Sequence, residues 1–237
     1  MLISNSQMDL QWIERPVRDI VVRHTLSKGT KVRFKKRTVI IEEGSIVQHA
    51  YVIFKGWAAY YLSNPCGQAR IASLVGPLRS FGLGPALDQL PVKVSIVAVE
   101  DCEMYRVSRS DLIQAMQEDV NFGIEMVSVV NMRVRSILEG ANIFSSLSTP
   151  EQRLIYYFIS LLQSEGVKED GEWYALPVNL CHEQIGEIID TSRITVCRMF
   201  NRFKQTEKLK MEHNRIYIHK KFVENYLRTE LLSSFLL

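Results

Sequence analysis

The segment from Asp190 to Phe203, DTSRITVCRMFNRF, combines side chains that can hydrogen-bond to nucleotide bases with side chains that can neutralise phosphate. At about 100° per residue, an α-helix places Val196, Met199, Phe200 and Phe203 on one stripe, which must be buried. Arginine donates two parallel hydrogen bonds to guanine, and an apolar side chain can contact a thymine methyl group. The segment therefore predicts a helix that reads duplex DNA through Ser192, Arg193, Ile194, Thr195, Cys197, Arg198, Asn201 and Arg202.

Ile194 is an apolar residue on the face that this helix should leave open. Scattered surface hydrophobes are normal in folded proteins, so an isolated isoleucine would need no explanation. Ile194, however, stands at a helix start between Arg193 and Thr195, and the first turn of a recognition helix is the part that reaches base edges. We expect Ile194 to contact a base.

The residues before and after this helix complete a winged helix-turn-helix. CHEQIGEII predicts a short helix that buries its isoleucines, Asp190 and Thr191 form the turn, and Ser192 is a good N-cap. KLKMEHNRIYIH then predicts a two-stranded wing whose Lys208, Lys210 and Arg215 can contact phosphates.

The charge of this region fits such a role. Between residues 191 and 221 there are nine basic and two acidic residues, although the whole chain carries a net charge of only +3. The alternative is a solvated charged face with no ligand. A local excess of cations beside a predicted reading helix favours phosphate as the partner.

The first half of the chain has a different pattern. The β-branched and aromatic runs TVII, AYVIF, AAYYL, ARIASLV, VSIVAV and CEMYRV, separated by glycine-containing turns, predict a small antiparallel β-roll or jelly roll. The basic run from Lys28 to Arg37 precedes them and is expected to be an exposed edge or loop.

A long helix connects the two halves. From residue 119 to 144 apolar or small residues recur in steps of three and four, at Gly123, Val127, Val130, Val134, Ile137, Ala141 and Phe144. This narrow heptad seam predicts pairing with a second copy, whereas Phe122, Ile124, Met126 and Leu138 could face the roll. Ser148 to Gln152 contains a capping box that starts a new helix.

We therefore predict an α+β protein with three parts. These are an effector-sensing β-roll domain at 1–118, a dimerisation helix at 119–145 and a winged helix-turn-helix DNA-binding domain at 146–237.

Composition and spacing argue against other classes. The chain has no apolar run of about 20 residues and no signal peptide, so we expect no membrane association and a cytoplasmic location. Its histidines form no His-x-His pair, and no phosphate-binding loop or nucleophile motif is present, which argues against an enzyme. Cys66, Cys102, Cys181 and Cys197 are widely spaced and predict reduced thiols.

The order of parts resembles the CRP/FNR superfamily of bacterial transcription regulators from about Thr38 to His219. The resemblance rests on the roll glycines Gly44, Gly56, Gly67 and Gly82, on EQIG at 183–186 and on SRITVCR at 192–198. It implies a homodimer whose rolls sense a small-molecule effector and whose second helices read a near-palindromic site, acting as an activator with RNA polymerase as a further partner.

The sequence also departs from this family. Members commonly have glutamate, which accepts from cytosine, where Ile194 stands, so we predict a thymine methyl contact instead. The Arg-Ser pair that holds a cyclic phosphate is missing from FGLGPALDQLPVKVS, which argues against cyclic AMP. We expect a small organic effector, with no cofactor or metal, bound by Gly82, Leu83, Gly84, Val94, Asn131 and Arg133.

Three alternatives stay open. Cys181 or Cys197 could make the regulator thiol-responsive, His24 or His49 could bind haem, and the chain could be an effector-binding module that does not bind DNA.

Overall fold

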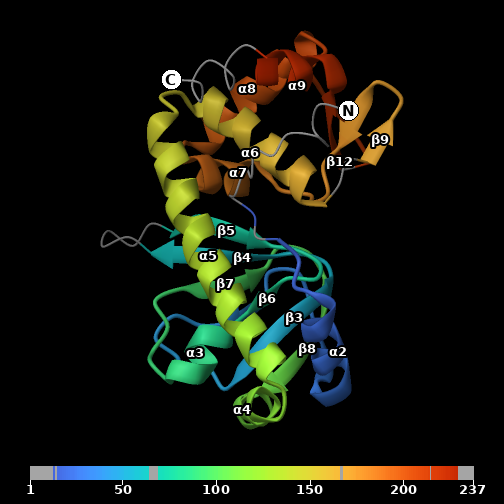
Figure 1. Ribbon diagram of the computed structural model, residues 1–237. Coiled ribbons are helices and arrows are strands. Elements are labelled where there is room, and N and C mark those ends of the chain that lie inside the picture. Colours follow the sequence, from blue (N-terminus) through green and yellow to red (C-terminus); the bar gives the residue numbers. More distant parts are fainter. Residues whose placement is uncertain (1–12, 14, 64–68, 166–167, 214, 229–237) are drawn as a thin grey trace. The chain divides into compact units, whose positions relative to one another are not determined.

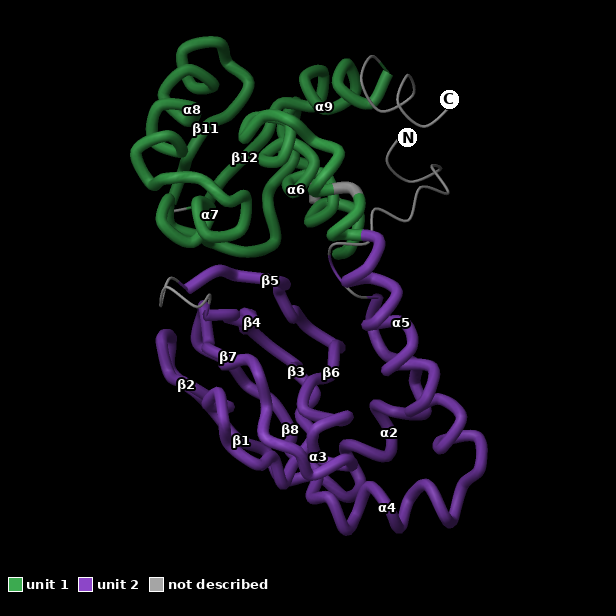
Figure 2. The backbone as a smooth tube through the Cα atoms, turned by 90° about the vertical axis from the view of Figure 1, so that its left-hand side faces the viewer, with its two compact units in different colours: residues 1–12, 140–237 green, residues 13–139 purple. Residues whose placement is uncertain are grey.

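The computed structural model describes residues 13–228 except 14, 64–68, 166–167 and 214. The chain divides into two compact units, residues 13–139 and residues 140–237, and each is described separately (Figure 2). Cys66 and Gly67 lie outside the described residues, and so does Gly166, the glycine at which the sequence predicts the end of the helix that the capping box starts.

The first unit is an antiparallel β-roll with helices around it (Figure 1). Its sheets have the strand orders β1-β8-β3-β6 and β2-β7-β4-β5. The elements are α2 (Asp19–Lys28), β1 (Thr30–Phe34), β2 (Val39–Ile41), β3 (His49–Lys55), β4 (Ala58–Ser63), β5 (Ala69–Val75), β6 (Ser80–Phe81), α3 (Leu83–Asp88), β7 (Ser95–Ala98), β8 (Cys102–Ser108), α4 (Arg109–Glu118) and α5 (Val120–Ser146). The end of α5, from residue 140, belongs to the second unit.

One hydrophobic core joins the two sheets. Ile53, Phe81 and Met104 of the first sheet are fully buried, and Ala58 and Val75 of the second are buried with them. All six predicted strands are present, because their β-branched and aromatic residues pack well on a half-buried pleated surface. The fold class is as predicted, and it follows from the alternation along these strands.

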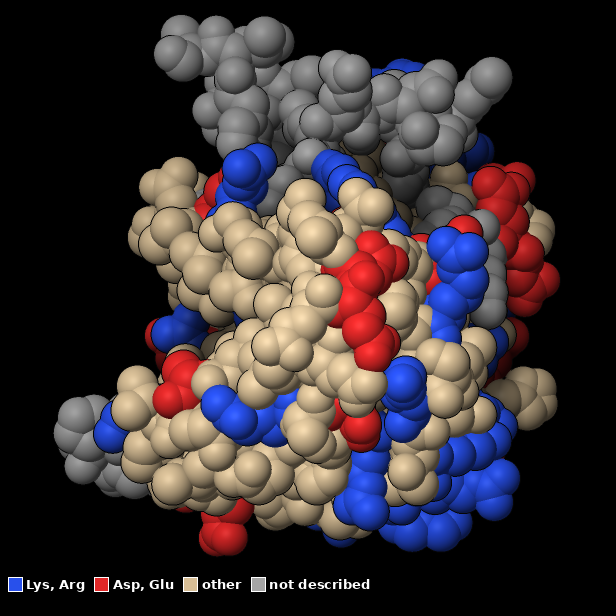
Figure 3. All heavy atoms as spheres, turned by 60° about the horizontal axis from the view of Figure 1, so that its bottom comes forward, with Lys and Arg blue, Asp and Glu red and all other residues tan. Residues whose placement is uncertain are grey.

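Part of the basic run from Lys28 to Arg37 forms an edge strand. β1 pairs only with β8 among the described strands, and its Lys31 lies 2.7 Å from the carboxylate of Glu103. Lys35, which directly follows β1, lies 2.8 Å from the carboxylate of Asp101. Figure 3 shows Lys and Arg side chains gathered at one edge of the displayed face. Lysines on an edge strand discourage pairing with another chain, which explains this run structurally.

Helix α5 buries one side and exposes another. Phe122, Met126 and Val129 are buried, whereas Val127 and Val134 of the heptad seam are exposed. The expectation that Ile124 and Leu138 could face the roll is wrong, since both are exposed. The buried residues of α5 recur every three or four positions, so only one stripe of the helix packs inward.

The second unit is a winged helix-turn-helix (Figure 1). Its central helix α6 starts with the predicted capping box, in which Gln152 N–H donates to Thr149 Oγ1 at 3.2 Å and Thr149 N–H donates to Gln152 Oε1 at 3.1 Å. The sheet order is β11-β12-β10-β9. The elements are α6 (Pro150–Glu165), β9 (Lys168–Asp170), β10 (Trp173–Ala175), α7 (His182–Ile189), α8 (Arg193–Gln205), β11 (Leu209–Glu212), β12 (Arg215–His219) and α9 (Lys220–Tyr226).

Sequence analysis missed α2, α3 and α9, which are short. In α2 the signal was present: Val21 and Thr25, four residues apart, are its buried residues, Asp19 lies in its first turn and Gly29 follows its end. None of the described helices combines the length and apolar composition that crossing a bilayer requires.

Candidate DNA-reading interface

The turn between α7 and α8 is tight and depends on two residues. Asp190 adopts left-handed backbone geometry with φ of 53°, which aspartate tolerates better than most residues. A Cβ on Gly186 would lie 2.7 Å from the carbonyl oxygen of Thr191, so only glycine fits against the turn. Ser192 Oγ then accepts from the N–H of Thr195 at 3.1 Å and caps α8 as predicted.

Helix α8 has the two predicted faces. Its buried residues are Val196, Met199, Phe200 and Phe203. Ile194 keeps 64% of its surface exposed. Of the residues predicted to contact DNA, Thr195 is half-buried, and the exposed ones are Ser192, Arg193, Ile194, Cys197, Arg198, Asn201 and Arg202. All eight therefore lie on α8 or at its N-cap, away from its buried stripe, while their contact with DNA stays a prediction.

Two of the three basic residues that were expected to contact phosphates near the wing, Lys208 and Lys210, lie over aromatic rings. The ammonium of Lys208 lies 4.8 Å from the centroid of the Phe222 ring, and that of Lys210 lies about equally close to two rings, those of Trp173 and Tyr217. These cation–π contacts fix both lysines near the sheet. Arg215, at the start of β12, is exposed.

His182, the first residue of α7, lies beneath the recognition helix. Its ring centroid is 4.6 Å from that of Phe200. Burial lowers the pKa of His182, and the charges of Lys204 and Arg193 lower it further. A neutral imidazole at neutral pH follows, so His182 supports the helix by packing and adds no charge to the basic surface.

Comparison with known proteins gives matches in both halves. The family model "Cyclic nucleotide-binding domain" matches residues 31–119, and "Crp-like helix-turn-helix domain" matches residues 152–221. The chain belongs to the CRP/FNR family of transcription regulators. This regulator thus joins an effector-binding domain to a DNA-binding helix-turn-helix.

Individual relatives of the regulator are distant. "Cyclic AMP receptor protein" of Thermus thermophilus is 25% identical over 162 residues, which are 68% of this chain and 71% of that protein. Among solved structures, FixK2 from Bradyrhizobium japonicum has a TM-score of 0.67 at 17% identity, covering 83% of this chain and 96% of that one. A CooA mutant from Carboxydothermus hydrogenoformans has a TM-score of 0.69 at 15% identity, covering 91% and 98%. Both structures support the same fold.

The residues predicted to bind the effector differ in their exposure. Gly82 and Leu83 start α3, and Leu83 is buried, whereas Val94 is half-buried and Asn131 is exposed on α5. Gly84 has open space where a Cβ would point. The guanidinium of Arg133 donates to the carbonyl of Ser80 and lies 5.5 Å from the centroid of the Tyr60 ring.

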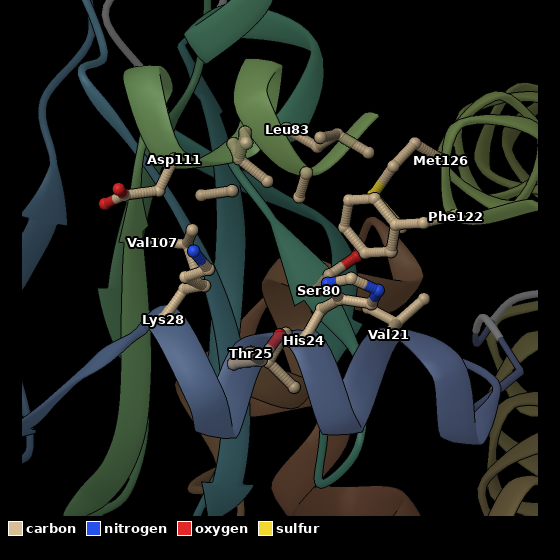
Figure 4. Close-up of a pocket in the computed structure, with 14 residues that line it drawn as sticks. Val21, His24, Thr25, Lys28, Ser80, Leu83, Val107, Asp111, Phe122 and Met126 are labelled. Carbon is tan, nitrogen blue, oxygen red and sulfur yellow. The ribbon is translucent and has the colours of Figure 1, made fainter. Parts of the chain in front are cut away.

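A cavity of about 20 Å³ lies between α2, α4, α5 and the roll (Figure 4). Its lining is mainly apolar and includes Leu83, Phe122 and Met126, so Leu83 is the one predicted effector residue that borders it. In Figure 4 the Ser80 hydroxyl and the rings of His24 and Phe122 lie beside one another. Sequence reasoning missed this cavity because it depends on how three helices pack.

The histidines and cysteines suggested as haem ligands or redox-active thiols all lie among the described residues of the regulator. His24 packs on Phe122 and lies 3.5 Å from the Asp119 carboxylate, while His49 lies in β3. No group of three or more His, Cys, Asp or Glu side chains in the described ranges is placed to hold a metal ion. Burial raises the pKa of the Cys102 thiol to about 11, whereas Cys181 and Cys197 are exposed.

Proposed function

We propose that this regulator acts as a homodimer, binds near-palindromic duplex DNA through α8, and changes its DNA affinity when a small organic effector binds. The observation that carries the proposal is the two-faced α8, whose phenylalanines are buried while Ile194 and Arg198 are exposed. A capped helix start with outward arginines suits insertion into the major groove. No catalytic activity is part of this proposal, and we place the protein in the cytoplasm with the DNA.

The dimer proposal is supported by the exposed seam of α5. Val127, Val130, Val134 and Ile137 follow one another in heptad spacing, and all of them are exposed in the single chain. Exposed apolar residues in one row on a long helix are costly in water and suit a matching row on a second copy. A twofold axis along α5 would give two reading helices and hence two half-sites about one DNA turn apart.

We further propose a small, largely apolar effector other than cyclic AMP. The loop between Gly82 and Ser95 contains Lys93 but no arginine, so it lacks the guanidinium that would hold a cyclic phosphate in two parallel hydrogen bonds. The residues offered as its contacts remain Gly82, Leu83, Gly84, Val94, Asn131 and Arg133. The cavity beside Leu83, at about 20 Å³, has room for little more than a water molecule and is not part of the proposal.

RNA polymerase is the proposed further partner, with activation as the proposed output. A thiol-responsive regulator is the second candidate, because Cys181 and Cys197 are exposed at the start of α7 and on the outward side of α8.

The deciding experiment is a DNA-binding titration. The full chain should select a two-part, near-palindromic site from a random duplex pool, and its affinity should fall steeply as salt rises, because phosphate contacts release counterions. Cyclic AMP and a metabolite panel are then added separately. Absence of binding to any duplex at low salt, with and without small molecules, would favour the module that does not bind DNA.

A further inference from the structure

One guanidinium in the DNA-binding unit joins two segments that are far apart in the sequence. Arg153, near the start of α6, donates from Nε to the carbonyl of Ile189 at 2.8 Å and from Nη2 to the carbonyl of Asp190 at 3.4 Å. From Nη1 it donates to the carbonyl of Leu147 at 3.2 Å, and its guanidinium carbon lies 4.9 Å from the centroid of the Phe144 ring. Arg153 therefore contacts both the end of α5 and the turn before α8.

At the turn, Arg153 donates hydrogen bonds to carbonyl groups for which α7 itself offers no donor. The last carbonyls of α7 have no partner within the helix, and a cation at a helix C-terminus also interacts favourably with the helix dipole. Arg153 supplies both the hydrogen bonds and the charge at Ile189 and Asp190. Because Asp190 is the left-handed residue of the turn and α8 begins only three residues later, its position sets the direction in which α8 leaves.

The other contacts of Arg153 are with the end of the long helix α5. Phe144 lies in the last turn of α5, and Leu147 follows directly after its end at Ser146. A planar guanidinium with donors in a fixed fork can hold carbonyls of two segments at a defined angle, which a single flexible ammonium cannot do equally well. The side chain of Arg153 thus contacts both the last turn of α5 and the turn before the reading helix.

We propose that Arg153 is a positioning residue for operator recognition: it sets the direction of α8 relative to the end of α5, and thereby the half-site spacing that the dimer accepts. This inference rests on the proposed function, since spacing has meaning only for two paired reading helices. Arg153 does not touch DNA in this scheme. It acts on Asp190, and through Asp190 on α8.

The test compares three duplexes for each variant of the full chain. The first carries a single half-site from the element that the wild type selects, the second carries the complete element, and the third carries the element with one base pair inserted between its half-sites. Arg153→Met keeps the length of the side chain but removes its hydrogen bonds. It should bind the single half-site within about twofold of wild type, bind the complete element about tenfold more weakly, and discriminate less against the inserted base pair.

Controls separate positioning from charge and from folding. Arg23→Met removes the same charge from the exposed surface of α2 and should bind all three duplexes like wild type. Arg153→Lys, which keeps the charge, should show a smaller change of the same kind, and it replaces Arg153→Met if that variant fails to fold. Urea unfolding establishes which variants are folded.

The outcomes are distinguishable. Equal losses on the single half-site and the complete element would overturn the inference, because Arg153 would then only stabilise the reading head. Unchanged spacing discrimination in a folded variant would overturn it as well. If the wild type itself selects no two-part element, the proposed function fails instead.

Discussion

Arg202, on the outer side of the recognition helix, is already paired with a carboxylate: its Nη2 donates to Glu151 at the start of α6. Both side chains stay partly in water, with 56% of the Arg202 side chain and 36% of the Glu151 side chain exposed. An exposed ion pair of this kind contributes at most about 1 kcal/mol to stability. Its larger effect should be on DNA binding, since a phosphate must compete with Glu151 for the same guanidinium.

Glu151→Gln should therefore strengthen DNA binding. Freeing Arg202 to neutralise a phosphate should raise affinity about threefold at low salt and steepen the salt dependence by about one counterion. The measurement is a binding titration at several salt concentrations. Glu172→Gln, which changes net charge equally at the turn between β9 and β10, should give a smaller increase, and equal effects of the two would argue against competition at Arg202.

Ile194→Glu should change which base pair is preferred at one position of each half-site. A carboxylate accepts a hydrogen bond from cytosine, whereas isoleucine offers a thymine methyl only an apolar contact. We expect a switch from an A·T to a G·C pair worth about tenfold in affinity, measured by competition among single-substitution duplexes. Ile194→Ala should lose the preference without acquiring the new one. An unchanged preference in both variants would mean that Ile194 does not read a base.

Val134→Asp should convert the proposed dimer to a monomer. Val134 lies in the exposed seam of α5, so two copies would bring two carboxylates into an apolar interface, and we expect the dimer dissociation constant to rise by about 100-fold or more. Sedimentation velocity at several concentrations measures it. Ser128→Asp places the same charge on the exposed surface of α5 away from the seam and should remain dimeric. A dimer with Val134→Asp would show that the seam is not the interface.

The stability of the protein should fall as the pH drops below about 6.5. Burial, with help from neighbouring cations, lowers the pKa of His182 and of His49 in the folded state. The unfolded chain therefore takes up protons first, so the stabilisation is complete at pH 7 to 8 and is lost as the pH falls toward the folded-state values. Urea unfolding between pH 8 and 5.5 should show a shallower decline for His182→Gln than for wild type. An equally steep decline in His182→Gln and in wild type would contradict this prediction.

Local patterns in the sequence were enough to predict the reading helix. The spacing of Val196, Met199, Phe200 and Phe203 fixes which side is buried, and Ser192 fixes where the helix begins. The same holds for the strands of the roll and for the capping box at Thr149 and Gln152. Each of these features depends on residues within one turn or one strand, so the sequence itself contains the information.

The tertiary structure alone decided how distant residues meet. Nothing local to Arg153 or Glu151 indicates that the first holds the turn at Asp190 or that the second pairs with Arg202, since each partner lies more than thirty-five residues away. The cavity beside Leu83 likewise exists only where α2, α4 and α5 pack together. Periodicity determines which face of an element is buried, but contacts between elements depend on how those faces pack. The sequence was therefore enough to predict the reading surface, whereas only the fold showed which residues hold that surface in place.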